Sequence, residues 1–368
     1  MNKKDEIQRS IINEIIKNNF KGIILASVRS GKTRQLLTSI KEHSENYIEN
    51  PTVLVLYPNT DIKISWEKEC NLINYHPDIT YCTFVSIDKV KDLTFDYICV
   101  DESHLLAEET QLITASYINK RNKHVIFASG TYSESTLETL QFHTGLDLIV
   151  NYTTEQAIKD GIVSDFNIQI HTYNLNATTV KEFGKVKKWK STDLKECNRL
   201  SFKVNSSSGK EKMFAALTRM HFINNCDSLV NCVNHWISNN KDKRFILFTG
   251  SENVGKRYNL PMWNSKSKDD SILQAFQNQK INQLCLIKKG KQGITYPMLQ
   301  HILITNIDSN GENLEQAIGR SLLNDTEDAT IHIFVSSEQF QLKWLSSALQ
   351  NINTEKIRYV KNDKKESK

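Results

Sequence analysis

Short apolar runs alternate with longer amphipathic segments along this chain, and that alternation is typical of an α/β protein with parallel sheets. The apolar runs predict buried strands over residues 22–25, 52–57, 81–87, 95–100, 124–128, 166–175, 244–249, 283–287, 301–304 and 331–335. Apolar residues at helical spacing predict helices over residues 7–16, 34–40, 212–222, 228–237, 270–277 and 338–349. Residues 176–209 show neither period, so they are predicted to form an insertion or a loop.

The first predicted strand leads into a sequence typical of a phosphate-binding loop. Residues 26–33 read Ala-Ser-Val-Arg-Ser-Gly-Lys-Thr, which follows the pattern G-x-x-x-x-G-K-[ST] except that Ala26 replaces the first glycine. Such a loop aims backbone N–H groups at an anion, while Lys32 reaches the outer phosphates and the Thr33 hydroxyl holds magnesium. The remaining loop residues are Ser27, Val28, Arg29, Ser30 and Gly31. Taken alone, the pattern also fits an ordinary helix start made of Ser, Gly and Lys.

Two adjacent carboxylates, Asp101 and Glu102, follow the predicted strand at 95–100. A nucleoside triphosphatase needs one carboxylate to hold magnesium and another to orient or deprotonate the attacking water. Asp101 suits the first role and Glu102 the second. An acid-rich helix start would also place two carboxylates side by side. The buried strand before the pair and the Lys-Thr loop upstream favour the catalytic interpretation.

Together, residues 26–33 and the sequence Asp-Glu-Ser-His at 101–104 resemble motifs I and II of superfamily 2 helicases and translocases, in the DExH group. This resemblance implies an α/β fold of two tandem RecA-like domains, each a mainly parallel sheet flanked by helices. It also implies ATP and Mg²⁺ in the interdomain cleft, with nucleic acid lying across both domains. The domains are predicted at residues 1–165 and 166–368, and the second carries a basic insertion at about 176–210.

Further motifs follow in the order that this family has. The resemblance implies that Gln8 recognises adenine, and that Ser129 and Thr131 couple the ATP site to nucleic acid. It also implies contacts to the nucleic-acid backbone from hydroxyl and lysine side chains near the ends of predicted strands. These side chains belong to Thr60, Ser86, Thr249, Ser251, Lys289 and Thr295. Taken singly, each of these residues fits an ordinary polar turn or an exposed helix position, so it is their order along the chain that supports the resemblance.

The sequence from 315 to 323 resembles the family's motif Q-x-x-G-R-x-x-R, in which Gln316 and Arg320 match. The resemblance implies that an arginine from the second domain stabilises charge on the transferring γ-phosphate. Leu323 stands where the last arginine of the motif belongs. Either Arg320 carries this role alone, or hydrolysis is slow or depends on a partner.

The composition is that of a globular protein large enough for two domains, with 39% hydrophobic and 24% charged residues among 368. No run of 18 apolar residues occurs, and the first residues lack the apolar segment of a signal peptide. We therefore expect a cytoplasmic protein with no membrane partner, and the Asn-, Ile- and Lys-rich composition suits a phage or a low-GC bacterium. The seven cysteines are scattered without a C-x-x-C pair, which indicates neither a zinc site nor a disulfide framework.

The formal net charge is only +5, but the basic residues are unevenly distributed. The segment 181–212 contains ten Lys or Arg residues against four Asp or Glu, and a second basic cluster closes the chain. Trp189 lies among lysines, so its ring could stack on a base. A flexible, solvated surface loop explains the same segment equally well.

These observations predict an ATP-dependent helicase that acts on nucleic acid, with DNA favoured over RNA. Trp66 and Glu67 resemble a pattern of Swi2/Snf2-like translocases, which move on duplex DNA without separating its strands. Ala26 and Leu323 instead favour a nucleotide-gated clamp with little hydrolysis. Nothing in the sequence reads bases directly, so binding to the backbone should depend strongly on salt.

Overall fold

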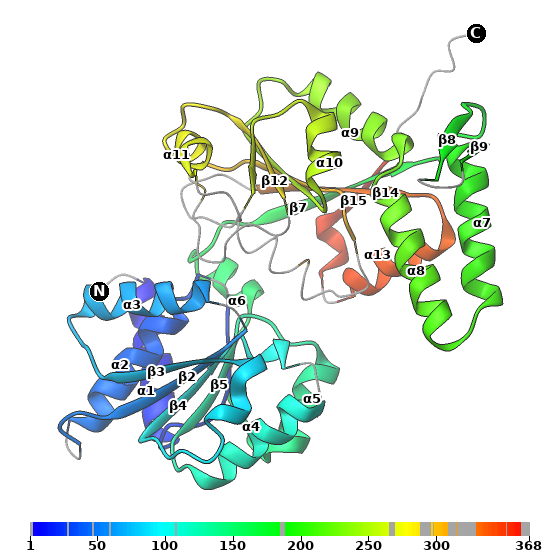
Figure 1. The fold of residues 1–368 in the computed structure, drawn as a ribbon. Coiled ribbons are helices and arrows are strands. Elements are labelled where there is room, and N and C mark those ends of the chain that lie inside the picture. The colour runs from blue at the N-terminus through cyan, green and yellow to red at the C-terminus, as the bar shows by residue number, and fades with distance from the viewer. Residues whose placement is uncertain are drawn as a thin grey trace. The chain divides into compact units, whose positions relative to one another are not determined.

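Two parallel sheets organise the part of the chain that the structure describes (Figure 1). This computed structural model describes residues 3–27, 29–45, 48–58, 60–106, 109–184, 188–264, 269–287, 296, 298–307, 314, 329–350 and 352–361. The chain divides into two compact units between Ser164 and Asp165, and each unit contains one of the two sheets.

The first sheet has six parallel strands in the order β3-β2-β4-β5-β1-β6. The strands are β1 (Lys21–Ala26), β2 (Thr52–Tyr57), β3 (Asp78–Thr83), β4 (Tyr97–Asp101), β5 (Val125–Ser129) and β6 (Leu148–Tyr152). The helices are α1 (Lys3–Lys17), α2 (Lys32–Ser44), α3 (Asp61–Ile73), α4 (Glu109–Arg121), α5 (Glu134–Thr144) and α6 (Thr154–Lys159), with 3₁₀ turns η1 (Phe84–Lys89) and η2 (Ser103–Leu105).

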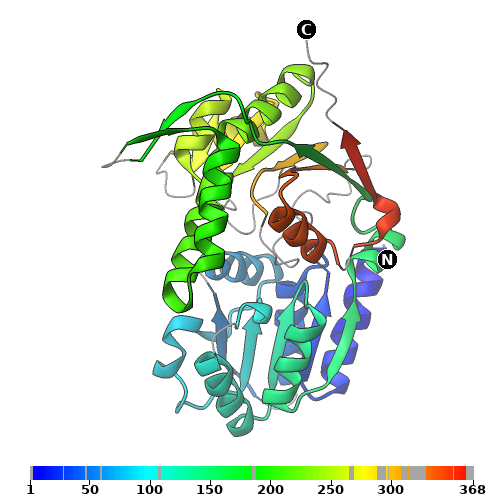
Figure 2. The same ribbon diagram turned by 90° about the vertical axis from the view of Figure 1, so that its right-hand side faces the viewer.

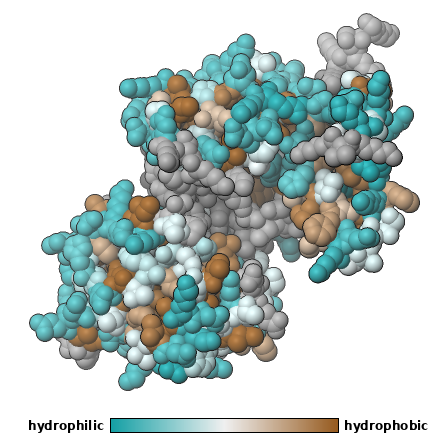
Figure 3. Space-filling view, in the orientation of Figure 1, coloured by the Kyte–Doolittle hydropathy of each residue, from teal (hydrophilic) through white to brown (hydrophobic). Residues whose placement is uncertain are grey.

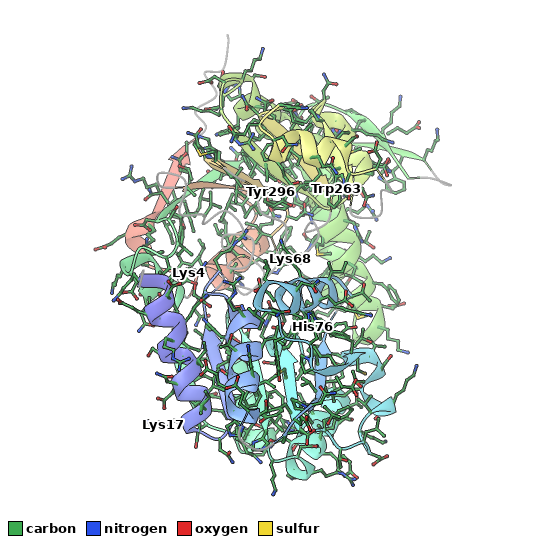
Figure 4. All side chains as sticks on the ribbon, turned by 90° about the vertical axis from the view of Figure 1, so that its left-hand side faces the viewer. Lys4, Lys17, Lys68, His76, Trp263 and Tyr296 are labelled. Atoms are coloured by element: carbon green, nitrogen blue, oxygen red, sulfur yellow. The ribbon has the colours of Figure 1, made fainter. Side chains whose placement is uncertain are left out.

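Helices cover both faces of the first sheet, with α1, α2 and α3 on one face and α4 and α5 on the other (Figure 1). Every residue of β4 and β5 is therefore buried, which explains why these strands read as continuous apolar runs rather than alternating ones. Cys99 is among the fully buried residues of β4. Lys4 and Lys17 mark the two ends of α1 in Figure 4. The stripe predicted for this helix is confirmed, because Ile11, Ile12 and Ile15 are buried.

The second sheet has seven parallel strands in the order β11-β12-β10-β13-β14-β7-β15. They are β7 (Phe166–Tyr173), β10 (Phe245–Thr249), β11 (Met262–Asn264), β12 (Gln283–Ile287), β13 (His301–Ile304), β14 (Ala329–Ser336) and β15 (Ile357–Lys361). A separate antiparallel pair is formed by β8 (Lys181–Phe183) and β9 (Trp189–Ser191). The helices are α7 (Asp193–Ser206), α8 (Gly209–Ile223), α9 (Asp227–Asn239), α10 (Glu252–Gly255), α11 (Ser271–Gln277) and α13 (Gln339–Ala348), with η3 (Lys256–Tyr258) and η4 (Thr354–Lys356).

The predicted fold class is confirmed, since each unit is a parallel sheet flanked by helices. Some predicted elements are wrong. The structureless segment at 176–209 contains the β8–β9 pair and helix α7, whose buried face was hidden among polar residues. The strand predicted at 81–87 ends at Thr83, and residues 84–89 form η1. Outside residues 176–209, three strands went unpredicted, namely β6, β11 and β15.

None of the helices in the described residues is long and apolar enough to cross a membrane.

Candidate nucleotide-binding site

Three loops of the first unit meet at one edge of its sheet. Strands β4, β5 and β1 are neighbours and run parallel, so their carboxyl ends lie together. The register pairs Leu25 of β1 with Ser129 of β5, and Asp101 of β4 with Ala128 of β5. The phosphate-binding loop, the Ser-Gly-Thr turn and the acidic pair therefore leave the sheet side by side.

The loop after β1 is held in shape from two helices. The Ser30 carbonyl oxygen accepts hydrogen bonds from Gln8 Nε2 of α1 at 2.7 Å and from Gln35 Nε2 of α2 at 3.0 Å. Gly31 has a φ of +91°, and a Cβ atom there would lie 2.3 Å from Gln8 Nε2. Arg29 also has a positive φ, of +72°. Only glycine meets both demands at position 31, since it tolerates this φ and leaves room for Gln8.

The start of α2 suits an anion. Lys32 and Thr33 are the first two residues of this helix, and both are half-buried. The N-cap residue Gly31 supplies no side-chain hydrogen bond, so the first N–H groups of the helix keep their capacity to bind phosphate. The Ser30 side chain is 2% exposed, and its Oγ finds no partner among the described residues. An orphaned buried hydroxyl in this loop fits a ligand that supplies hydrogen-bond acceptors. Val28 lies outside the described residues.

Asp101 is a buried carboxylate with donors on both oxygens. Its Oδ2 accepts from the indole Nε1 of Trp66 on α3 at 2.9 Å, and its Oδ1 accepts from the Glu102 backbone N–H at 3.0 Å. Burial raises the pKa of Asp101 to about 6; the negative charge of Glu102 acts in the same direction, while Lys32 and the indole lower it. The influence of Lys32 shows that the structure brings the loop and the acidic pair together. A carboxylate and a hydroxyl, here those of Asp101 and Thr33, are oxygen donors of the kind that Mg²⁺ prefers.

Glu102 is joined to the Ser-Gly-Thr turn through His104. Glu102 Oε2 lies 3.4 Å from His104 Nδ1, and Nδ1 lies 2.7 Å from Ser129 Oγ. The Ser129 hydroxyl donates to the Thr131 carbonyl oxygen at 2.6 Å and accepts from the Thr131 N–H at 3.1 Å. Because its single proton is used on Thr131, Ser129 receives the proton of His104 Nδ1. His104 therefore lies between the acidic pair and the turn after β5, in close contact with Glu102 and hydrogen-bonded to Ser129.

Four further predicted residues lie near the carboxyl ends of other strands. Thr60 is exposed at the N-cap of α3 and makes no capping hydrogen bond, and Ser86 lies in η1 after β3. In the second unit, Thr249 ends β10 and is 3% exposed, and its Oγ1 has no partner among the described residues. Ser251 Oγ donates to Asn225 Oδ1 at 3.3 Å.

The other predicted site residues lie outside the described residues. They are Lys289, Thr295, Gln316, Arg320 and the substituted position Leu323. Their assignments stay predictions.

The sequence did not indicate two contacts that shape this site, the Trp66 bond to Asp101 and the Gln35 bond to Ser30. Trp66 is fully buried, and its indole N–H also holds the acidic side chain. The strand order explains this contact, because β2 and β4 are neighbours and α3 follows β2.

Comparison with known proteins agrees with this architecture. The family model of the helicase conserved C-terminal domain matches residues 228–322, in the second unit. No curated protein matches the sequence.

The fold resembles several solved structures. S. cerevisiae Dbp5 bound to RNA and ADP BeF3 has a TM-score of 0.60 and 10% identity, over 97% of this chain and 90% of that one. The DEAD-box helicase Mss116 bound to ssRNA and UDP-BeF has a TM-score of 0.59 and 15% identity, over 96% and 74%. The ATP-dependent Type ISP restriction-modification enzyme LlaBIII bound to DNA has a TM-score of 0.59 and 12% identity, over 98% and 31%. At these identities the likeness establishes the fold, which is the tandem RecA-like core of helicases.

Proposed function

We propose that this protein is a superfamily 2 motor that couples hydrolysis of Mg-ATP to movement along, or unwinding of, nucleic acid. One observation carries the proposal. The Gly-Lys-Thr loop, the Asp101–Glu102 pair and the Ser129–Thr131 turn leave three neighbouring parallel strands at one edge, and His104 contacts both Glu102 and Ser129. The helicase family match in the second unit and the tandem RecA-like fold support it.

The site residues of the first unit have separate roles in this proposal. The N–H groups of loop 27–31 and Lys32 bind the ATP phosphates, and Thr33 and Asp101 hold Mg²⁺. The metal neutralises negative charge on the β- and γ-phosphates when it is bound. Glu102 orients the attacking water and accepts its proton. Gln8 contacts adenine in this proposal, in addition to the hydrogen bond that its Nε2 donates to Ser30.

His104 links Glu102 to the turn after β5. Because His104 contacts both Glu102 and Ser129, a shift of the turn after β5 changes how the base is held. The assignment of Ser129 and Thr131 to coupling rests on this link.

The second unit is proposed to supply Gln316 and Arg320 to the γ-phosphate. Contacts to the nucleic-acid backbone are assigned to the hydroxyl and lysine side chains that follow the strands of both units. These are Thr60, Ser86, Thr249, Ser251, Lys289 and Thr295. The preference for DNA over RNA stays a prediction, since the similar structures named above include both RNA-bound and DNA-bound proteins.

The test is ATP hydrolysis measured without polymer and with single-stranded DNA, duplex DNA and RNA. We expect one polymer to stimulate turnover. In the Glu102→Gln variant, kcat should fall by about 10²- to 10⁴-fold while ATP binding is kept, because the general base is lost but the phosphate contacts remain.

Other results would redirect the proposal. ATP binding without turnover under every condition would contradict a motor and support the nucleotide-gated clamp. Stimulation by duplex DNA, without strand separation on a forked substrate, would identify a duplex translocase instead of a helicase.

A further inference from the structure

The second unit carries a helical arm of two helices, of which the sequence predicted only the second. Helices α7 and α8 pack side by side as an antiparallel pair joined at residues 207–208, and we call residues 193–223 the arm. Figures 1 and 2 show the arm running away from the second sheet, with the β8–β9 pair at its base.

The base of the arm is firmly attached to its unit. Lys181 of β8 lies 2.6 Å from Asp193 Oδ1 at the start of α7. The other oxygen of Asp193 accepts from the backbone N–H and the hydroxyl of Ser228 in α9, at 3.0 and 2.6 Å. The Arg219 guanidinium of α8 stacks on Phe340 of α13, 3.9 Å from the ring centroid. These contacts fix the direction in which the arm projects.

The outer part of the arm exposes large apolar side chains. Phe202 of α7 is 74% exposed and Phe214 of α8 is 61% exposed, and each lies within about two helical turns of the connection between the helices. Met213 and Leu217 share a face of α8 with Phe214 and are 55% and 41% exposed. Figure 3 shows brown and tan side chains on this arm. Exposed apolar residues of this size, three of them on one face of α8, indicate an interaction surface.

The charge around these side chains is positive and uncompensated. Three of the acids in segment 181–212 are engaged by basic neighbours: Glu182 by Lys188, Asp193 by Lys181 and Glu196 by Arg199. Lys203, Lys210 and Lys212 are exposed and form no salt bridge within the described part of the chain. Only Glu211 among the acids of this segment lacks such a pair there. The surface therefore complements a polyanion.

Trp189 is not the aromatic side chain best placed for this contact. Its Nε1 donates to Glu196 at 3.0 Å, and the Arg199 guanidinium lies over its ring at 4.9 Å. The Trp189 indole thus makes contacts within the base of the arm. The exposed rings of Phe202 and Phe214 are therefore better candidates for stacking on bases.

We propose that the arm is a binding site for single-stranded nucleic acid, in which Phe202 and Phe214 stack on bases and Lys203, Lys210 and Lys212 contact phosphates. Exposed rings flanked by unpaired lysines are the features with which proteins hold single strands without reading their sequence. This inference rests on the proposed function, because that function makes nucleic acid the polymer on which the protein acts.

The first experiment measures binding of fluorescein-labelled poly(dT) and poly(U) by anisotropy, with the full chain and without ATP. The double variant Phe202→Ala/Phe214→Ala should bind about 10-fold more weakly for each lost ring, or about 100-fold in all. The matched control is Phe142→Ala, since Phe142 is 86% exposed on α5 of the first unit. The control should bind as the wild type does. Hydrolysis of ATP without polymer should be unchanged in all three proteins.

The second experiment removes charge instead of rings. The triple variant Lys203→Ala/Lys210→Ala/Lys212→Ala should reduce the slope of log affinity against log salt by about 2, since each phosphate contact on a single strand contributes about 0.7. The control is the triple variant of exposed lysines in the first unit, Lys120→Ala/Lys123→Ala/Lys159→Ala, which changes the net charge equally. Its slope should stay that of the wild type.

Two outcomes overturn the inference and are distinguishable. If the wild type binds the oligonucleotides and both arm variants bind them equally well, the arm is not a nucleic-acid site, its surface serves a protein partner, and the proposed function stands. If the wild type binds neither oligonucleotide, the inference fails, and the proposed function then depends on whether duplex DNA stimulates ATP hydrolysis.

Discussion

The two sheets share a layout but place their buried polar groups differently. In the first unit, the buried Asp101, His104, Ser129 and Thr131 lie at or just beyond the carboxyl ends of strands. In the second unit, three histidines form a hydrogen-bonded row across three neighbouring strands. His171 Nε2 lies 3.0 Å from His332 Nδ1, and His332 Nε2 lies 3.1 Å from His301 Nδ1.

The difference shows how to separate chemistry from scaffolding in such a fold. The histidine row is satisfied within the protein, and Trp236 packs over it, 4.6 Å from the His332 ring centroid. The polar groups at the edge of the first sheet leave Ser30 Oγ and Thr131 Oγ1 without partners among the described residues. Buried polar groups whose partners are missing indicate a ligand, whereas a closed network indicates structure.

The largest expected effect is on ATP hydrolysis, when one of two buried tryptophans is replaced. Trp66 donates to Asp101 at 2.9 Å, and Trp263, labelled in Figure 4, donates to Asp270 at 3.0 Å. Trp66→Phe should lower ATP hydrolysis by about 10- to 100-fold, since it frees the side chain that is proposed to hold Mg²⁺. Trp263→Phe removes an equivalent bond in the second unit and should leave hydrolysis unchanged. Steady-state kinetics over a range of Mg²⁺ concentrations provides the measurement.

Melting temperatures supply the control for this pair. Both variants should be destabilised, by about 1–3 kcal/mol at most, because each removes one hydrogen bond to a carboxylate. An equal loss of hydrolysis in both variants would mean that general destabilisation, and not the position of Asp101, explains the effect.

A smaller effect is expected from acidification of the histidine row. Burial lowers the pKa of His171 and His301 to about 4, and burial together with the two neighbouring imidazoles lowers that of His332 to about 2. Below its ordinary pKa of 6.5, each histidine is protonated in the unfolded chain but not in the fold. Their contribution to stability is therefore complete above about pH 6.5 and declines as the pH falls.

The substitution His332→Gln isolates one histidine of the row. For His332 alone, the loss between pH 7 and pH 5 is about 2 kcal/mol. Urea unfolding of the wild type and the variant should show a difference in stability that narrows by this amount over the same interval, since other titrating groups cancel. A difference that stays constant from pH 7 to pH 5 would contradict the burial of a neutral imidazole.

The last comparison distinguishes two glycines in the loops that follow strands β1 and β10. A Cβ at Gly31 would lie 2.3 Å from Gln8 Nε2, and one at Gly250 would lie 2.2 Å from Asn306 Nδ2. Gly31 also has a φ of +91°, so Gly31→Ala should cost about 1–3 kcal/mol in backbone strain and raise the KM for ATP. Gly250→Ala requires only that the Asn306 amide move, and should cost less. Thermal melting and ATP kinetics test both, and an equal loss in the two would refute the role assigned to φ.

Most of the site that could be predicted from the sequence lies in contiguous motifs. Lys32 and Thr33 end the loop after β1, Asp101 ends β4 and Glu102 comes next, so the parallel order of the strands brings these motifs to one edge. The bond from Trp66 to Asp101 joins residues that are 35 positions apart, and no local pattern encodes it. Side-chain contacts of this kind depend on the packing of a helix on the sheet and appear only in three dimensions.

The fold was predictable where apolar runs are long and continuous, and less so at its edges. Helix α7 was missed although Cys197, Leu200 and Val204 recur at helical spacing, because charged residues surround them. Strand β15 is short and has few buried residues, so its sequence shows little hydrophobic pattern. Its pairing with β7 defines it as a strand. Elements that depend on tertiary pairing carry a weak local signal.

Helix α3 has a mechanical consequence. It begins beside Thr60, which is proposed to contact nucleic acid, and five residues later it carries the indole that donates to Asp101, so both positions lie on one helix. A ligand that displaces the start of this helix must therefore alter the hold on Asp101. Thermodynamic reciprocity then requires that whatever binds at Asp101 changes the affinity of that ligand by the same factor. In the proposed motor, the indole N–H of Trp66 therefore couples binding at the start of α3 to binding at Asp101.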